Sequence, residues 1–143
     1  MVKLEGRVRA VIKKSRVARL ATLDDDTAQP YLVPVVFVFD GKRFFIPLDE
    51  KSKGVSIDKL RRVKNIQKNS NVALLVDEYS DDWSKLLFVL IQGSASITGP
   101  KQKDLLLKAH KLLLEKYPQY KKVGIGKSCI VIDTKKVIFW QNK

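Results

Sequence analysis

The sequence predicts a mainly β protein with helices (α+β), in which an antiparallel β-barrel carries helices in its crossovers. Segments rich in β-branched and aromatic residues outnumber the amphipathic segments, and short hairpin turns join most of them. No internal repeat or low-complexity tract is present. The 143 residues, of which 45% are hydrophobic, suit a single domain over residues 1–143 with a continuous core.

A hairpin in the first third of the chain is the clearest local prediction. Residues 31–39 read YLVPVVFVF, and the dipeptide Asp40-Gly41 that follows them is typical of a tight turn. Residues 43–47 then supply the return strand. Three further strands are predicted at residues 17–23, 72–76 and 86–98.

The second half of the chain is expected to contain a bulge and a final hairpin. Gly93 lies where a continuous apolar run changes to alternation, which predicts a bulge near it. The apolar segments 128–133 and 136–140 flank Thr134-Lys135, which predicts a hairpin. Apolar residues at helical spacing predict three amphipathic helices, at residues 3–14, 55–68 and 105–116.

The chain is strongly basic. Its 28 Lys and Arg residues against 15 Asp and Glu residues give a formal charge of +13, which attracts anions to the surface. A solvated basic surface, as on heat-stable proteins, explains this excess equally well. The densest basic stretch is residues 51–68, whereas acidic residues cluster at 24–26 and 77–82.

Side-chain catalysis and metal chemistry are disfavoured. Cys129 and His110 are the only cysteine and histidine, and neither has a partner near it in sequence, so no catalytic residue and no metal ligand is assigned. The first residues lack the apolar core of a signal peptide, and no apolar run is long enough to cross a bilayer. These features predict a cytoplasmic protein without membrane contact, whose redox or transfer chemistry would need a cofactor.

The best candidate anion site is the basic turn Lys51-Ser52-Lys53, which stands between a predicted strand end and a predicted helix start. Helix N-terminal amides attract negative charge, the serine hydroxyl donates a hydrogen bond, and the lysines add positive charge, so the turn favours phosphate. Pro34 and Pro47 each remove a backbone donor from a strand. They lie either at ordinary sheet edges or beside a ligand, and both interpretations remain open.

Four blocks of the sequence resemble the pyridoxamine-phosphate-oxidase-like proteins, in particular a subfamily presumed to use a deazaflavin. The blocks are RVARLATLD, QPYLVPVVFVFDGKRFFIPLDEKSK, LRRVKNIQKNSNVALLVDEYSDDW and FVLIQGSASI. The resemblance implies a split β-barrel of the FMN-binding type. It also implies a homodimer with two cofactor sites in the clefts between subunits, and FMN or, alternatively, the deazaflavin coenzyme F-420 as the cofactor.

The resemblance further implies a set of cofactor-binding residues. In this alignment the basic turn holds the phosphate, the strand residues lie against the flavin ring, and Trp83 lies near the cofactor, across the dimer or in a structural position. The implied residues are Val33, Pro34, Val35, Val36, Ile46, Pro47, Lys51, Ser52, Lys53 and Trp83.

Three positions depart from the vitamin-producing oxidases of this family. Tyr31 replaces an arginine, Val36 a lysine and Phe88 a glutamine. These departures argue against pyridoxamine phosphate as the substrate, and they leave the choice between FMN and the deazaflavin open.

We therefore expect a flavin- or deazaflavin-dependent oxidoreductase that moves a hydride between its cofactor and an unidentified small molecule. Two alternatives are a flavin-binding carrier without turnover and a basic barrel that binds nucleic acid. The nucleic-acid alternative is disfavoured, because aromatic residues do not alternate with basic ones as a stacking platform requires.

Overall fold

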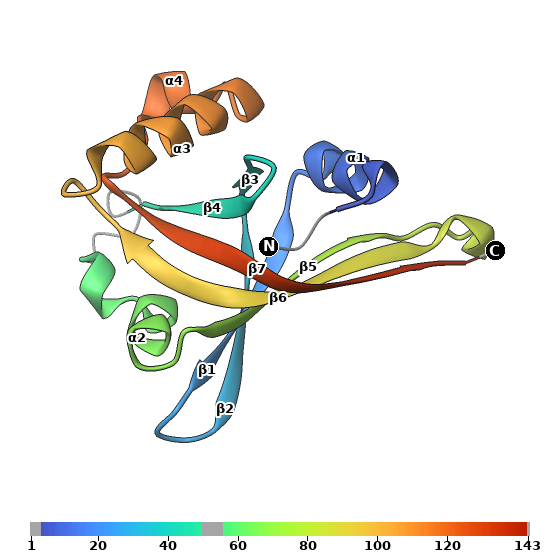
Figure 1. The fold of residues 1–143 in the computed structure, drawn as a ribbon, viewed down its shortest axis with the longest axis horizontal. Coiled ribbons are helices and arrows are strands. Elements are labelled where there is room, and N and C mark those ends of the chain that lie inside the picture. The colour runs from blue at the N-terminus through green and yellow to red at the C-terminus, as the bar shows by residue number, and fades with distance from the viewer. Residues whose placement is uncertain (1–3, 50–55, 143) are drawn as a thin grey trace.

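The computed structural model describes residues 4–49 and 56–142, and the strands within them form a seven-stranded antiparallel sheet (Figure 1). The strand order is β2-β1-β5-β6-β7-β4-β3. The strands are β1 (Ala18–Asp24), β2 (Gln29–Val35), β3 (Val38–Phe39), β4 (Arg43–Leu48), β5 (Asn71–Glu78), β6 (Leu87–Thr98) and β7 (Ser128–Gln141). The helices are α1 (Gly6–Lys14), α2 (Arg61–Lys68), α3 (Lys103–Lys116) and α4 (Tyr120–Val123), and the short 3-10 turns are η1 (Ile57–Lys59) and η2 (Trp83–Lys85).

The sheet curls into a barrel that stays open along one line. β2 and β3 stand at opposite ends of the strand order, yet only residues 36 and 37 separate them in the chain. Three residue steps reach at most about 11 Å, so the two ends of the sheet lie next to each other. β3 has only two residues and pairs with β4 at Phe44 and Phe45, which leaves the barrel split. The predicted antiparallel split β-barrel is confirmed.

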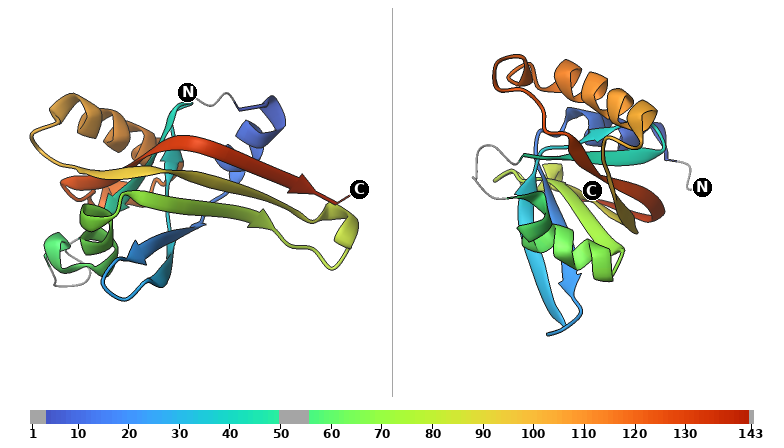
Figure 2. Two further views of the ribbon diagram at one scale, coloured as in Figure 1. Left: turned by 60° about the horizontal axis from the view of Figure 1, so that its bottom comes forward. Right: turned by 90° about the vertical axis from the view of Figure 1, so that its left-hand side faces the viewer.

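Two hydrophobic clusters stabilise this arrangement. The larger one fills the barrel, and Ile12 of α1 and Val63 of α2 are completely buried in it. The smaller one lies between α3 and the opposite face of β4 and β7, where Phe45, Leu113 and Cys129 are completely buried. α3 therefore covers the outside of the sheet, whereas α1 and α2 pack into the barrel core (Figure 2).

The predicted strand 31–39 and the predicted helix 55–68 are both interrupted. The strand breaks at residues 36–37, where the chain passes from one end of the sheet to the other. In the described part of the helix, η1 is followed by extended Leu60 (φ −65°, ψ 133°), and α2 starts only at the next residue. The predicted helices 3–14 and 105–116 correspond to α1 and α3.

The predicted final hairpin at 128–133 and 136–140 is wrong, because β7 is one continuous strand. The predicted bulge near Gly93 is confirmed: β6 and β7 change register between Gln92 and Gly93, and Lys135 is the extra residue on β7. A Cβ on Gly93 would overlap the carbonyl oxygen of Asp133, so the close approach requires glycine.

The two halves of β7 look like separate strands in sequence because they have different neighbours. Residues 128–133 lie between β4 and β6, and residues 128–132 are all buried. Residues 136–141 pair with β6 alone, and their burial alternates. This second half forms, with β5 and β6, a long arm that extends beyond the barrel (Figure 1).

Candidate functional site

The opening of the barrel lies between β2 and β4. β2 pairs with β1 only, and β4 pairs with β3 at no residue beyond Phe45 within the described chain. Continuing that register would bring Val36 opposite Pro47, which has no N–H to donate. Pro34 and Pro47 therefore lie on the two strands that border the opening, and both strands carry backbone groups there that no neighbouring strand pairs.

The residues implied to contact the flavin ring differ in how accessible their side chains are to a ligand. Val35 and Ile46 are buried in the barrel core, and Val36 packs against the cluster beneath α3. Pro34 is exposed on the edge strand, whereas Pro47 is buried. A ligand in the opening would consequently meet backbone groups and the surface of Pro34 more than the valine and isoleucine side chains.

The basic turn Lys51-Ser52-Lys53 lies outside the described residues. The described chain leads to it from Leu48, the completely buried last residue of β4, and resumes at Ser56 before η1. A Cβ at Gly126 would overlap the carbonyl oxygen of Leu48, so the segment before β7 packs tightly on the end of β4. The strand end from which the turn departs is thus firmly anchored.

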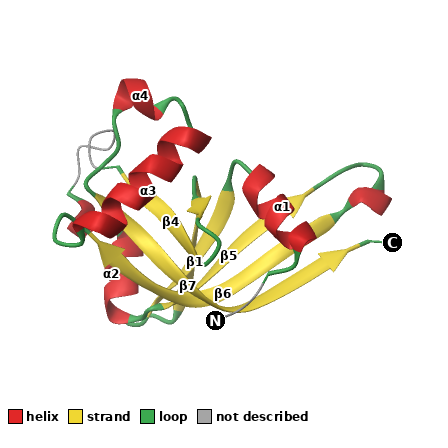
Figure 3. Ribbon diagram, turned by 45° about the horizontal axis from the view of Figure 1, so that its top comes forward, coloured by secondary structure: helices red, strands yellow, loops and turns green. Residues whose placement is uncertain are grey.

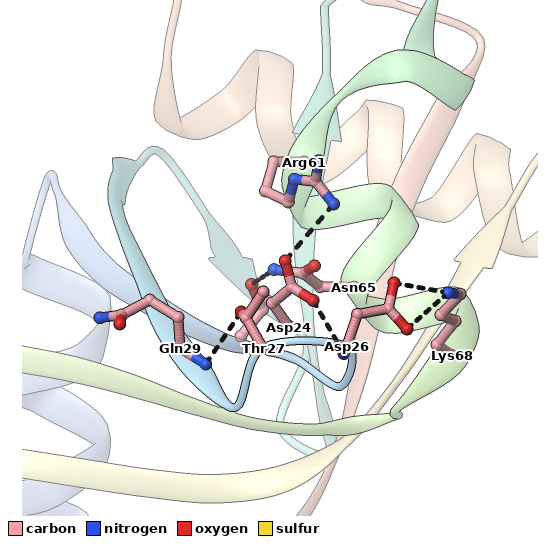
Figure 4. Close-up of polar contacts among 8 residues, drawn as sticks. Asp24, Asp26, Thr27, Gln29, Arg61, Asn65 and Lys68 are labelled. Atoms are coloured by element: carbon pink, nitrogen blue, oxygen red, sulfur yellow. Dashed lines mark hydrogen bonds and ion pairs between the residues drawn. The ribbon is translucent and has the colours of Figure 1, made fainter.

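Ion pairs connect α2 to the last residue of β1 and to the loop between β1 and β2 (Figure 4). Lys68 Nζ lies 2.9 Å from Asp26 Oδ2, and Arg61 Nη1 lies 3.6 Å from Asp24 Oδ2. The hydrogen bond from Lys68 lowers the pKa of Asp26. Two of the cations in the densest basic stretch are therefore neutralised by carboxylates, which weakens the case for nucleic-acid binding by this helix.

Amide hydrogen bonds complete the attachment of α2. Buried Asn65 donates from Nδ2 to Thr22 Oγ1 on β1 over 3.0 Å, and Asn69 Nδ2 donates to Asp25 Oδ1 over 2.8 Å. The helix that follows the basic turn is therefore held on β1 and on the β1–β2 loop, and so on the hairpin that carries the candidate edge strand β2.

Arg62 is a candidate binding residue that the sequence analysis missed. Its Nε is buried and has no hydrogen-bond partner in the described part of the chain, although buried donors are normally satisfied. Burial lowers the pKa of Arg62, and the nearby Tyr31 of β2 acts in the opposite direction. A signal was present in the sequence, because Arg62 precedes buried Ile66 by four residues and so shares its helix face.

Trp83 lies away from the opening of its own barrel. It belongs to η2 at the tip of the β5–β6 arm, the residue is 65% exposed, and its carbonyl oxygen accepts a hydrogen bond of 2.6 Å from Asn142 Nδ2. Figure 1 shows this tip far from β2 and β4. Within one chain, Trp83 is not brought together with the other implied residues.

The arm presents an apolar face made by Leu75, Phe88, Leu90, Ile138 and Trp140. Leu75, Leu90 and Ile138 are paired across β5, β6 and β7, and the Phe88 and Trp140 rings stack with centroids 5.8 Å apart. Trp140 is 43% exposed. Ile138 is 36% exposed, whereas Leu75, Phe88 and Leu90 are half-buried. Apolar surface that stays partly exposed on adjacent strands is a candidate interaction site.

The remaining reactive side chains have structural surroundings. His110 Nε2 lies 3.0 Å from the carbonyl oxygen of Gly126, and burial raises the pKa of the Cys129 thiol to about 12. No group of His, Cys, Asp and Glu residues that could hold a metal occurs in residues 4–49 and 56–142. None of the described helices is both long and apolar enough to cross a membrane.

The sheet order, the short β3 and the unpaired edges at the opening define an antiparallel split-barrel protein. The sequence model of the pyridoxamine 5'-phosphate oxidase family matches residues 4–141, and the chain belongs to this family. A search of curated protein sequences finds no match.

Solved structures from several bacteria share the fold. A conserved hypothetical protein from Mycobacterium tuberculosis aligns with a TM-score of 0.76 at 20% identity, over 99% of this chain and 86% of that one. The heme storage protein HutZ from Vibrio cholerae aligns with a TM-score of 0.72 at 13% identity, over 98% of this chain and 95% of HutZ. An FAD-binding protein from Mesorhizobium loti aligns with a TM-score of 0.65 at 19% identity, over 94% of this chain and 92% of that protein.

Proposed function

We propose that residues 1–143 form a single split-barrel domain that works as a flavin- or deazaflavin-dependent oxidoreductase on an unidentified small molecule. The observation that carries this proposal is the opening between β2 and β4, because the chain continues from the anchored end of β4 through Asp49-Glu50 to Lys51-Ser52-Lys53. Membership of a family that commonly binds flavins supports a cofactor of this type.

In this proposal the basic turn, α2 and the strands at the opening contact different parts of the cofactor. Lys51 and Lys53 neutralise the cofactor phosphate, Ser52 donates a hydrogen bond to it, and Arg62 supplies a further donor from α2. The backbone of residues 33–36 and Pro47 hold one face of the ring and keep water from it. When bound, the cofactor accepts and releases the hydride.

We also propose that the chain forms a homodimer through the apolar face of the arm. The face lies on three adjacent strands, and burying it against a second copy removes apolar surface from water. A second copy would also carry its own Trp83 to a neighbouring barrel, which one chain alone does not achieve. Trp140→Glu is expected to shift the protein toward monomer in analytical ultracentrifugation, with Val123→Glu at an exposed apolar position on α4 as a control for the same change in charge. An unchanged sedimentation coefficient in Trp140→Glu would remove the arm from the interface.

Cofactor binding is tested by titrating the purified protein separately with FMN and with coenzyme F-420, followed by absorbance and fluorescence. We expect micromolar or tighter binding of one of them, and a loss of about tenfold or more in affinity for Lys51→Gln/Lys53→Gln. Lys121→Gln/Lys122→Gln removes the same charge from exposed positions on α4 and serves as the control. Absence of binding to both cofactors would overturn the proposal.

The contribution of Arg62 is tested with Arg62→Met, which retains much of the apolar length of the side chain. We expect weaker cofactor binding with little change in thermal stability, because Nε has no partner in the described chain to lose. The control is Lys64→Met on the exposed side of α2. Equal affinities of the two variants for the cofactor would exclude Arg62 from the site.

A carrier without turnover is the second candidate, and one observation favours it. The described residues at the opening, Val33–Val36, Ile46 and Pro47, include no acid or base. Stopped-flow reoxidation of the reduced, bound cofactor by a panel of acceptors distinguishes the two functions. An enzyme should discriminate among acceptors of similar potential, whereas a carrier should not.

A further inference from the structure

A cleft between α1 and α3 is lined by residues of both helices and of β3. Figures 1 and 3 show the two helices on the same side of the sheet. The volume of the cleft is about 590 Å³, which is within the range of small-molecule sites. Val38 and Phe39 of β3 and Leu112 of α3 supply apolar surface. The cleft is thus large enough for a ligand and has apolar walls against which one could pack.

The charged side chains of the cleft are mostly cationic and come from both helices. Asp40 already has partners: its Oδ1 accepts hydrogen bonds from the backbone N–H groups of Lys42 and Arg43, and its Oδ2 forms an ion pair with Lys108 Nζ at 2.8 Å. Its side chain is only 2% exposed, and Lys108 balances its charge. The charged residues lining the cleft are Arg9, Lys13, Asp40, Lys108, Lys111, Glu115 and Lys116.

Four of these cations have no carboxylate within ion-pair distance in the part of the chain that the structure describes. They are Arg9 and Lys13 of α1 and Lys111 and Lys116 of α3, and Glu115 is the remaining carboxylate of the lining. Like charges on two facing helices repel each other, and the repulsion is relieved when an anion lies between them.

Lys116, which also lines the cleft, shows how partial burial there affects an ammonium group. Its Nζ lies 3.8 Å from the centroid of the buried Phe37 ring, so the ammonium group is partly withdrawn from water. Burial and, to a lesser extent, the charge of Arg16 lower the pKa of Lys116 to about 8. An anion bound nearby would favour the charged form and raise this pKa.

We infer that the cleft between α1 and α3 binds a small organic anion that carries a phosphate or carboxylate group on an apolar or aromatic body. Cations from both helices would hold the anionic group, and Phe39 and Leu112 would contact the apolar body. This inference does not depend on the proposed cofactor site, because its residues belong to α1, α3 and the β3–β4 hairpin and not to β2, α2 or residues 51–53.

Isothermal titration calorimetry with phenyl phosphate and with inorganic phosphate tests the inference on the full chain. Phenyl phosphate should bind more tightly, since only its ring can use the apolar wall. Lys13→Gln/Lys111→Gln, which changes two exposed side chains, should weaken phenyl phosphate binding by about tenfold. Lys121→Gln/Lys122→Gln should leave it unchanged. Equal losses in the two double variants would show attraction by net charge alone and would overturn the inference.

The basic turn could also take phosphate, so a second variant separates the two sites. Phenyl phosphate binding should persist in Lys51→Gln/Lys53→Gln, even when that variant no longer binds FMN. If phenyl phosphate binding is lost in Lys51→Gln/Lys53→Gln and retained in Lys13→Gln/Lys111→Gln, the cleft is not the site.

Acetylation at pH 8, mapped by mass spectrometry, gives an independent measurement of ligand binding in the cleft. Phenyl phosphate should slow labelling of Lys116 and not of Lys121, and equal rates with and without ligand would count against the cleft.

Discussion

The hydroxyl group of Tyr117 satisfies backbone groups at the point where the chain leaves β2 for β3. Tyr117 Oη accepts a hydrogen bond of 3.2 Å from the backbone N–H of Phe37. The same oxygen lies 2.9 Å from the carbonyl oxygen of Arg16 and 3.1 Å from that of Phe37, to either of which it can donate. Because Phe37 lies between the two ends of the sheet, its N–H belongs to no strand ladder.

Tyr117→Phe removes this hydroxyl and leaves the ring in place. Tyr117 is only 6% exposed and Phe37 is completely buried, so water cannot easily replace the lost partner. An unsatisfied buried donor costs about 1–3 kcal/mol, and we expect the free energy of unfolding to fall by this amount. The ring contacts, including the Arg16 guanidinium 4.7 Å from the Tyr117 ring centroid, remain available to the variant.

Urea denaturation followed by circular dichroism measures the loss, with Tyr120→Phe as the control. The Tyr120 ring packs edge-on against Tyr117 at 6.3 Å, but no hydrogen bond to its hydroxyl occurs among residues 4–49 and 56–142. Tyr120→Phe should therefore change the free energy of unfolding by no more than about 0.5 kcal/mol. Equal losses in the two variants would refute the assigned role of the Tyr117 hydroxyl.

Three further predictions concern other parts of the barrel. Gly126→Ala should lower the free energy of unfolding by about 1–3 kcal/mol in urea denaturation, because the new Cβ would overlap the carbonyl oxygen of Leu48; an unchanged midpoint would contradict the tight packing at the end of β4. Burial raises the pKa of Asp40, but the hydrogen bonds from Lys108 and the backbone outweigh it and hold this pKa below its ordinary value. Asp40→Asn should therefore be less stable than the native chain above about pH 4, and the difference should narrow as the pH falls below that value; a constant difference from pH 7 to pH 3 would argue against the ion pair. The Cys129 thiol is buried and its pKa is raised to about 12, so it should react with Ellman's reagent only after unfolding; rapid reaction of the native protein would show that the strand is accessible.

Short sequence patterns were sufficient to predict those structural features that depend only on residues close together in the chain. The turn after residues 31–39 was predicted from Asp40-Gly41, and in the structure Gly41 has φ 100° while Asp40 Oδ1 accepts two backbone hydrogen bonds. The bulge at Gly93 was predicted from the change in apolar pattern and is confirmed. The turn and the bulge each lie at the residues whose pattern predicted them.

The incorrect predictions concern features that depend on contacts between residues far apart in the sequence. Thr134-Lys135 suggested a turn, yet β6 pairs along the whole of β7 and turns the polar interruption into a bulge. The break at residues 36–37 is invisible in a run of apolar residues, because it arises from the change of partner from β1 to β4. The acidic loop and the basic helix were read as separate charge clusters, whereas Lys68 and Asp26 form an ion pair 42 residues apart.

The amino-acid sequence by itself determined the class of fold, the order of most elements and the family, because periodicity, turn residues and block order are local properties of the chain. Only the tertiary structure decided where the barrel stays open, that Trp83 lies away from its own barrel opening, and that cations of α1 and α3 face each other across one cleft. Those features depend on which segments become neighbours when β2 and β3 bring the two ends of the sheet together. No short stretch of sequence contains that information, because it resides in contacts between residues that are distant along the chain.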